Sequence, residues 1–417
     1  MKRKASIMSH LTSDSLKNLS RQFGDAFYLL DSDTFEENYR ELKEAFSSIY
    51  PKFNIAYSYK TNYIPKLCKI IEANGGFAEI VSDMELEIAF RCGVTPSHII
   101  WNGPIKTLSK VEKFLTDGGT VNIDNFEEWE GILDFSKRHK EVSVNIGIRC
   151  NYDTGDGILS RFGIDIESEE FDKICKDISE SETIELVCLQ CHFAKRQLEY
   201  WGTRTRKMLE IYEYIGKVYG LVPRRIDLGG ALYGHMPKEL EVQIGYRMPG
   251  YRAYAEESAA LVAEYFKDKR DKPMLLIEPG TALAADSMKA VFRVKNIKNV
   301  RGKKIAAVLG SQKNISMNGI NPPIKIVPGG KEQKKYESID IAGYTCIESD
   351  YLYRNYQGYL AVDDFIVLSN CGSYSIVMKA PFILPDFPIL DICKGIEKAE
   401  VIKEAENFDN LFQAYAF

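Results

Sequence analysis

Eight short apolar runs follow one another through the first two thirds of the chain, and helical segments separate most of them. The runs are residues 53–60, 77–82, 98–103, 120–124, 142–149, 186–192, 225–230 and 274–280. The segments Ile64–Ala73, Met84–Arg91 and Phe126–His139 have helical character. Eight strands that alternate with helices predict an α/β fold, a (β/α)8 barrel of the TIM type, whose reactive side chains gather at the carboxyl ends of the strands. One pattern therefore predicts both the fold and the position of an active site.

A second domain is needed because the chain has 417 residues, whereas a barrel of this type occupies roughly 250. Strand-like alternation continues after Gly280 in residues 290–295, 304–310, 339–343, 359–362 and 364–369. These runs predict a C-terminal antiparallel β domain, either a barrel or a sandwich. The strand-like run Ala26–Asp31 precedes the barrel, and we expect it to pair with that domain. We therefore predict a barrel at 32–283 and a discontinuous β domain formed by 1–31 and 284–417.

Several classes of protein are disfavoured by charge and composition. The net charge is -5, and no stripe of lysine and arginine is interleaved with aromatic residues, so we expect no nucleic-acid partner. No apolar stretch reaches the length of a membrane span, and the basic segment Met1–His10 lacks the apolar run of a secretory signal. The nine cysteines favour reduced thiols in the cytoplasm over a disulfide framework. Cys188 and Cys191 would point to opposite faces of one strand, so we predict no metal site.

Two of the runs end in residues that could react with a cofactor or stack on it. Lys60 ends the first run, and burial there would lower its pKa and make the amine nucleophilic toward an aldehyde. The alternative is an ordinary surface lysine at the end of a strand. His192 ends the sixth run, where its ring could stack on an aromatic cofactor or form part of a hydrogen-bonded core.

The last two runs end in a glycine pair and in a carboxylate. The backbone of Gly229 and Gly230 could approach a phosphate closely, although paired glycines also mark tight turns. Glu278 could pair with a protonated ring nitrogen, or it could cap a turn. Together with the lysine and the histidine, these residues match the requirements of pyridoxal phosphate, whose ring acts as an electron sink.

A family resemblance follows from these motifs and from two more in the second domain. The motifs are Ala56-Tyr-Ser-Tyr-Lys60, Ser160-Arg-Phe-Gly-Ile164, Cys191-His192, Asp227-Leu-Gly-Gly230, Glu278-Pro-Gly280, Cys346-Ile-Glu-Ser-Asp350 and Gly372-Ser-Tyr374. From about Phe27 to Phe382 the chain resembles the fold-type III pyridoxal-phosphate decarboxylases, the family of diaminopimelate and ornithine decarboxylases. The resemblance implies a barrel like that of alanine racemase.

Roles for the cofactor-binding residues follow from the resemblance. It implies that Lys60 carries the cofactor, that His192 stacks on its ring and that Glu278 pairs with its pyridine nitrogen. The phosphate would lie against the glycine motifs and Tyr374. The residues that bind the phosphate would then be Gly229, Gly230, Gly280 and Tyr374.

The same resemblance implies a head-to-tail homodimer with shared active sites. Cys346 would come from the partner subunit and donate a proton after carbon dioxide has left. Asp350 would help to shape that shared site. Without the resemblance, Cys346 would be expected to be a half-buried thiol without a role in the chemistry.

Three departures from the family pattern concern the substrate. Thr281 replaces the usual arginine after Glu-Pro-Gly, and Ile347 replaces the acidic residue after the cysteine, unless Glu348 substitutes by a local shift. The loop after His192 contains Lys195 where relatives have Ile-Gly-Ser. We hypothesise that the far end of the substrate carries a carboxylate or a bulky acyl group, as in a modified or acidic diamino acid of secondary metabolism. The alternative is that these positions changed while an ordinary diamino acid was retained.

The predicted function is pyridoxal-phosphate-dependent decarboxylation of an amino acid to the corresponding amine. An amino-acid racemase on the same barrel would need bases on both faces of the cofactor, whereas this chain has the cysteine motif. A non-catalytic homologue that only binds the cofactor or regulates would be expected to lose Lys60 or Cys346, and both are present.

Overall fold

The structure is a computed structural model that describes residues 11–316, 320–379 and 381–417. The basic segment Met1–His10, which we predicted not to be a secretory signal, lies outside these residues. In the described part of the chain, none of the helices combines the length and the apolar character needed to cross a membrane.

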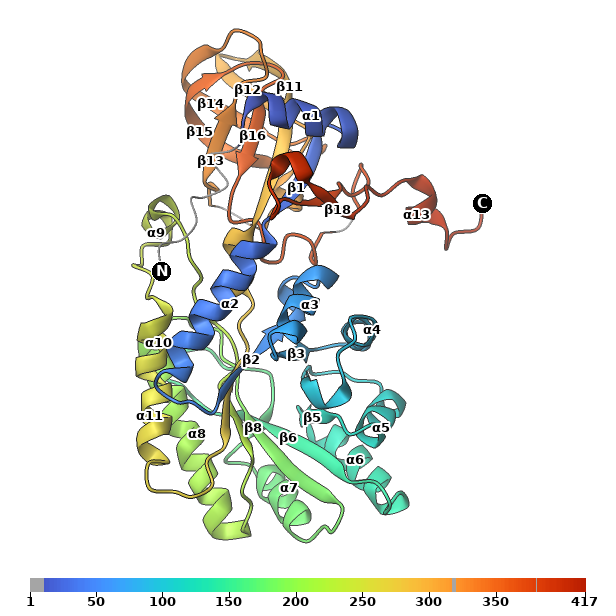
Figure 1. The fold of residues 1–417 in the computed structure, drawn as a ribbon, viewed down its shortest axis with the longest axis vertical. Helices are drawn as coiled ribbons and strands as arrows, with labels where there is room; N and C mark the ends of the chain where they lie inside the picture. The colour runs from blue at the N-terminus through green and yellow to red at the C-terminus, as the bar shows by residue number, and fades with distance from the viewer. Residues whose placement is uncertain (1–10, 317–319, 380) are drawn as a thin grey trace. The chain divides into compact units, whose positions relative to one another are not determined.

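The chain divides into two compact units, which we call the barrel unit and the β unit (Figure 1). The barrel unit comprises Glu36–Tyr233 and Pro249–Leu283. The β unit comprises the chain up to Phe35 together with Gly234–Met248 and Ala284–Phe417. The domain boundaries that the sequence predicts, with a barrel domain at 32–283, remain a proposal.

Within the described residues of the barrel unit, eight parallel strands form a closed barrel. They are β2 (Phe53–Ser58), β3 (Phe77–Ile80), β4 (Ile99–Trp101), β5 (Thr120–Ile123), β6 (Val144–Asn151), β8 (Ile184–Gln190), β9 (Arg225–Asp227) and β10 (Met274–Ile277). The short strand β7 (Ile164–Asp165) adds to β6. Pairing of β10 with β2 and of β5 with β6 completes the ring. Each predicted run overlaps one of these strands, so the predicted barrel is confirmed.

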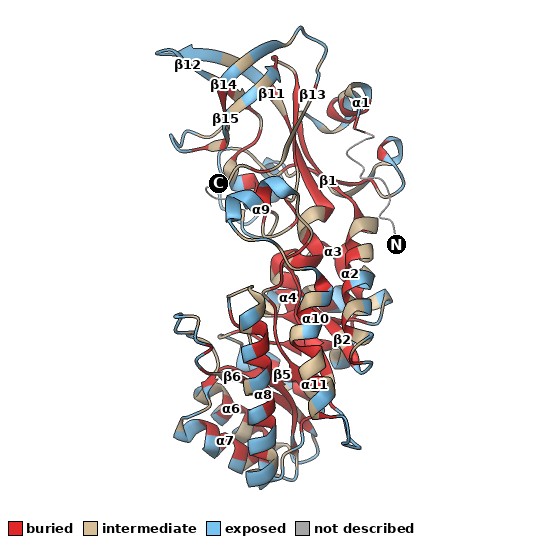
Figure 2. Ribbon diagram, turned by 90° about the vertical axis from the view of Figure 1, so that its left-hand side faces the viewer, coloured by how far each residue is buried: buried red, intermediate tan, exposed pale blue. Residues whose placement is uncertain are grey.

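Helices surround the barrel strands. They are α2 (Ser32–Ser47), α3 (Pro65–Ala73), α4 (Asp83–Arg91), α5 (Leu108–Thr116), α6 (Phe126–Arg138), α7 (Glu169–Ser179), α8 (Leu198–Tyr219), α10 (Tyr251–Glu257) and α11 (Ala259–Tyr265), with α12 (Thr281–Ala284) at the end of the unit. Side-chain caps begin three of them, because Ser82, Asn125 and Ser168 each accept a backbone N–H of the first turn. The strands β3, β4 and β5 contain only buried residues, while the outer helices alternate between buried and exposed positions (Figure 2).

The β unit is built mainly from antiparallel strands. They are β1 (Ala26–Leu30), β11 (Met288–Val300), β12 (Lys303–Val308), β13 (Ile324–Val327), β14 (Lys334–Ala342), β15 (Tyr351–Leu360), β16 (Phe365–Leu368), β17 (Ile389–Asp391) and β18 (Glu400–Lys403), with the helices α1 (Ser13–Phe23), α9 (Lys238–Ile244) and α13 (Phe408–Phe412). The predicted N-terminal strand pairs with β11, as expected. Two pairs, β1 with β17 and β12 with β14, are parallel rather than antiparallel. Each joins strands separated by a long stretch of chain, which leaves room for the crossover that a parallel pair requires.

The segment Gly234–Met248 joins the β unit through polar contacts. Gln243 Nε2 donates to the carbonyl of Asn321 at 2.9 Å, and Asn370 Nδ2 donates to the carbonyl of His235 at 3.1 Å. Helix α1 packs its apolar side against the sheet through Leu16 and Leu19. These contacts explain why pieces distant in sequence form one compact unit.

Candidate active site

Four chemically active side chains gather at the carboxyl ends of the barrel strands. Lys60 follows β2, Glu79 lies in β3, Asp227 ends β9 and Glu278 follows β10. The ammonium of Lys60 donates to Glu79 Oε2 at 2.6 Å. The Lys60 side chain is 33% exposed and that of Glu79 only 1% exposed, so the lysine reaches solvent while its partner is enclosed. The structure therefore places a lysine and several buried carboxylates at one end of the barrel.

Two amides connect these carboxylates to one another. Asn102 Nδ2 lies 3.0 Å from Glu79 Oε1 and 2.5 Å from Glu278 Oε1, so it can donate to both carboxylates. Gln190 Nε2 donates to Glu278 Oε1 at 3.1 Å. Each amide stands at the end of its strand, so the strands themselves set the spacing of the network.

The turns that carry Lys60 and Glu278 fit together only because Gly280 lacks a side chain. A Cβ atom on Gly280 would overlap the side chain of Thr61, in the short helical turn that carries Lys60. The backbone N–H of Ser58 donates to the carbonyl of Pro279 at 3.2 Å, and this hydrogen bond joins the two segments. The predicted residues Lys60, Glu278 and Gly280 are thus brought together.

The glycine pair after β9 forms a close-fitting turn beside His192. Gly229 has a φ of +70°, and a Cβ atom on it would overlap the carbonyl of Cys191. A Cβ atom on Gly230 would stand 2.5 Å from the carbonyl of Glu278, and the Gly230 N–H donates to His192 Nδ1 at 2.9 Å. Bare backbone therefore lines this part of the site next to the histidine ring, as a phosphate cradle requires.

Buried charge determines how the carboxylates titrate. Burial, together with the charges of Asp227 and Glu79, raises the pKa of Glu278 well above its usual value. Burial raises the pKa of Asp227 to about 7. Burial also opposes ionisation of Glu79, but the charge of Lys60 prevails and lowers the pKa of that carboxyl.

These directions fit a protonated pyridine ring. Glu79, Asp227 and Glu278 bring three carboxyl groups against the one positive charge of Lys60, and Asp227 Oδ2 is buried without a hydrogen-bond partner among the described residues. A ring N–H⁺ beside Glu278 would supply the missing positive charge. Burial and then the charge of Lys60 lower the pKa of His192 well below its usual value, so its ring is neutral and suited to stacking.

A buried arginine, which the sequence analysis did not identify, holds two loops of the site. Arg204 of α8 is fully buried and donates through Nη1 to the carbonyls of Leu228 and Gly230, at 3.1 and 2.9 Å. Its Nη2 donates to the carbonyls of Phe193 and Lys195, at 3.5 and 3.1 Å. The same guanidinium thus connects the glycine turn with the loop after His192.

The predicted residues of the β unit lie on two of its own turns. Cys346, Ile347 and Glu348 are exposed on the turn between β14 and β15. Asp350 is buried and accepts hydrogen bonds from Ser311, Gln312 and Thr345, so it holds this turn in place.

The remaining predicted residues are also partly accessible. Tyr374 is half-buried with a φ of +61°, and Thr281 begins α12 of the barrel unit as a half-buried residue. Lys195 is half-buried as well, and its carbonyl is held by Arg204. The roles of these residues, and of the Cys346 turn, toward a substrate or cofactor stay predictions.

Comparison with known proteins supports this reading of the barrel. The family model described as "Pyridoxal-dependent decarboxylase, pyridoxal binding domain" matches residues 32–285. The diaminopimelate decarboxylase of Methanothermobacter thermautotrophicus is 24% identical, over 95% of this chain and 92% of the relative. That of Aquifex aeolicus is also 24% identical, over 96% and 93%.

Solved structures share the fold. The structure of diaminopimelate decarboxylase from Methanocaldococcus jannaschii aligns with a TM-score of 0.85 at 23% identity, covering 96% of this chain and 94% of that one. The arginine decarboxylase of Paramecium bursaria Chlorella virus aligns with a TM-score of 0.72 at 18% identity, covering 91% and 100%. Both alignments include the barrel and the β unit, since they cover more than nine tenths of this chain.

Proposed function

Because this chain belongs to the pyridoxal-dependent decarboxylases, we propose that the strand-end cluster around Lys60 is where it removes the carboxylate of an amino acid. The chain is a pyridoxal-phosphate-dependent carboxy-lyase. The observation that supports this location most strongly is the pairing of Lys60 with Glu79 beside Glu278 and the glycine turn. When bound, pyridoxal phosphate supplies an aromatic ring that accepts the electron pair left by the departing carboxylate.

Different residues of the barrel unit would hold different parts of that cofactor. Lys60 binds it covalently, and Glu79 keeps the lysine amine oriented toward the centre of the site. The backbone of Gly229, Gly230 and Gly280 would line the phosphate, and Tyr374 of the β unit stays a predicted phosphate ligand. His192 covers the ring as a neutral imidazole, and Glu278 holds a proton on the ring nitrogen.

The substrate we propose is a diamino acid whose far end carries a carboxylate. The curated relatives named above are diaminopimelate decarboxylases, and diaminopimelate has such an end. Diaminopimelate also carries an ammonium at that end, and because the exposed Ile347 replaces the acidic residue of the family pattern, Glu348 would have to meet that ammonium. Lys195 would attract the far carboxylate. An acylated diamino acid is a second candidate favoured by Ile347 alone, and the names of the relatives do not support it.

Substrate preference tests this assignment. We expect carbon dioxide release with a kcat/KM at least about tenfold higher for meso-diaminopimelate than for ornithine or lysine, because a charge-matched far end is worth a few kcal/mol. Lys195→Glu should reduce this ratio about tenfold, because the new carboxylate would repel the far carboxylate of the substrate. Lys195→Arg keeps the positive charge, is the matched control and should keep the ratio. An unchanged ratio in Lys195→Glu would contradict the proposed pocket, and exclusive turnover of acylated diamino acids would favour the second candidate.

We also propose a head-to-tail homodimer in which each site contains Cys346 of the partner subunit. Cys346 lies on an exposed turn, held by the buried Asp350, which suits a residue offered to another subunit. In that position the thiol would donate a proton to the carbon that has lost its carboxylate. All nine cysteines are free thiols, and we propose a cytoplasmic location on that ground.

Mixing two inactive variants tests the shared site. Lys60→Ala and Cys346→Ala should each be strongly impaired alone. If each site takes its lysine from one subunit and its cysteine from the other, equal mixing gives half mixed dimers with one complete site each, and about a quarter of the wild-type activity returns. Cys393→Ala, in the same unit, is the control and should remain active. Mixtures no more active than the separate variants, after subunit exchange has been verified, would contradict the shared site.

A further inference from the structure

A separate cavity lies at the other end of the barrel, where the strands begin. It has a volume of about 350 Å³ and is lined by Lys52, Ser97, Gly118, Thr120, Asn145, Val187, Arg224, Arg225 and Met274. Thr120, Arg225 and Met274 are the first residues of their strands. Lys60 and Glu278, in contrast, follow strand ends, so this cavity is distinct from the candidate active site.

The cavity contains the positive charge of Arg225, a half-buried residue of which one guanidinium nitrogen is enclosed. Arg225 Nη1 is enclosed and has no hydrogen-bond partner among the residues that the structure describes. One face of its guanidinium lies 5.0 Å from the centre of the Phe77 ring. Arg224 differs, because its guanidinium is exposed and already bonded to Glu185. Burial lowers the pKa of Arg225, and the charge of Arg224 adds to this, while Cys188 and Asp227 oppose the shift without cancelling it.

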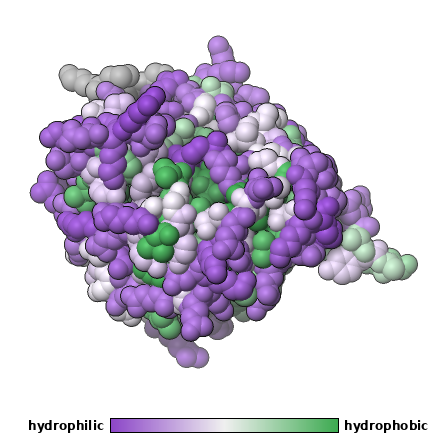
Figure 3. All heavy atoms as spheres, turned by 90° about the horizontal axis from the view of Figure 1, so that it is seen from below, coloured by the Kyte–Doolittle hydropathy of each residue, from purple (hydrophilic) through white to green (hydrophobic). Residues whose placement is uncertain are grey.

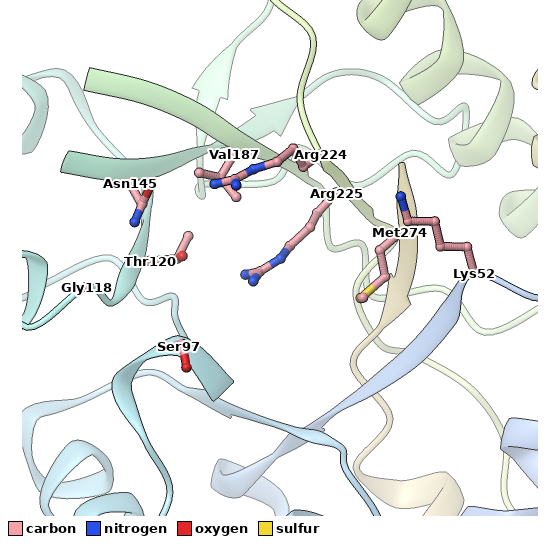
Figure 4. A pocket seen from close by; sticks show the side chains of 9 residues that line it. All are labelled: Lys52, Ser97, Gly118, Thr120, Asn145, Val187, Arg224, Arg225 and Met274. Carbon is pink, nitrogen blue, oxygen red and sulfur yellow. The ribbon is translucent and has the colours of Figure 1, made fainter. Parts of the chain in front are cut away.

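The other lining groups are suited to an anion. Figure 4 shows Arg225 reaching into the open space, with Ser97, Thr120 and Asn145 opposite it and Lys52 on the other side. The hydroxyl and amide groups can donate hydrogen bonds, and the lining residues named above include no aspartate or glutamate. Figure 3 shows the face of the molecule seen from below, where hydrophilic side chains surround a smaller apolar area.

We propose that this cavity is a binding site for a small oxyanion, a phosphate or carboxylate group, with Arg225 as its anchor. A guanidinium presents a planar fork of N–H donors that matches both groups. An enclosed N–H donor without an acceptor is costly, and a bound anion would supply the acceptor for Arg225 Nη1. Stacking on Phe77 fixes the fork in advance, which reduces the entropy lost on binding.

Titration of the protein loaded with pyridoxal phosphate tests the site, because the cofactor then occupies the other phosphate site. Inorganic phosphate and succinate are added separately in a zwitterionic buffer, and binding is followed by calorimetry and by the unfolding temperature. We expect saturable binding of at least one of them, with a matching rise in unfolding temperature. Arg225→Gln should weaken that binding at least tenfold. Arg252→Gln, an exposed arginine paired with Glu256, is the control and should bind as the wild type does.

The same variants separate a binding role from a structural one. In the absence of either anion, Arg225→Gln should unfold at the wild-type temperature or above it, because the change removes a half-buried charge with an unsatisfied enclosed donor. A lower unfolding temperature would indicate that Arg225 only plugs the end of the barrel, and it would overturn the proposal. Unchanged binding in Arg225→Gln, or no saturable binding of phosphate or succinate by the wild type, would also overturn it.

Discussion

Replacing Lys60 by alanine is expected to lower kcat by at least about a thousandfold, because the cofactor then has no amine to hold it in reactive geometry. The purified variant should also lack the visible absorbance of lysine-bound cofactor. Both effects follow from the position of Lys60. Its side-chain nitrogen lies 2.6 Å from Glu79 and so contacts the cluster of buried carboxylates. Absorbance spectra before and after addition of pyridoxal phosphate, together with carbon dioxide release, measure the two effects.

The controls for this variant must account for the carboxylate it leaves behind. Without Lys60, the buried Glu79 loses its counter-ion, and the fold could be weakened for that reason alone. The double variant Lys60→Ala and Glu79→Gln leaves a neutral pair and separates loss of chemistry from loss of stability. Lys69→Ala, on the exposed side of α3, should retain the absorbance. A lysine-linked absorbance that survives in Lys60→Ala would refute the assignment of Lys60.

The second large effect is expected for Glu278→Gln. We predict that this variant still takes up the cofactor through Lys60 but that its kcat falls on the order of a hundredfold, because an amide cannot balance a protonated ring nitrogen. The change keeps the size of the side chain, and Asn102 and Gln190 can still form hydrogen bonds with its carbonyl oxygen. Cofactor content and kcat for carbon dioxide release should be measured on the same samples.

Glu85→Gln offers a matched comparison for Glu278→Gln. Glu85 is also buried near the cluster, and burial raises its pKa to about 7, but its carboxylate accepts the Val81 N–H at the start of α4. Its substitution should leave kcat within about threefold of the wild type, since the contact is local and structural. Equal activity of Glu278→Gln and Glu85→Gln would show that the ring nitrogen needs no carboxylate partner here.

The part of the site that the sequence predicts depends on one geometric rule. All strands of a parallel barrel end on the same side, so Lys60, His192, Gly229 and Glu278 are brought together once the strands are recognised. Glu79, Asn102 and Gln190 obey the same rule, because each lies in a recognised run, in the carboxyl-terminal half of its strand or directly after it. They were missed because a carboxylate or an amide at a strand end does not by itself indicate a reaction.

Other features had no signal in the sequence. Arg204 belongs to a helix, and its side chain reaches backbone carbonyls, which no residue pattern encodes. The parallel pairing of β12 with β14 depends on a crossover rather than on the alternation within either strand. Asp350 holds the turn that carries Cys346 through hydrogen bonds that the sequence did not indicate, and its expected part in a shared site stays a prediction.

Arg204 also has a consequence for the timing of motions. Its guanidinium donates hydrogen bonds to carbonyls of two loops that follow two different strands. Movement of either loop therefore breaks hydrogen bonds to a side chain that also holds the other loop. Amide hydrogens of the two loops should therefore exchange with solvent at one common rate, in a single opening event rather than two. Cofactor entry and cofactor escape would then be limited by the frequency of that event.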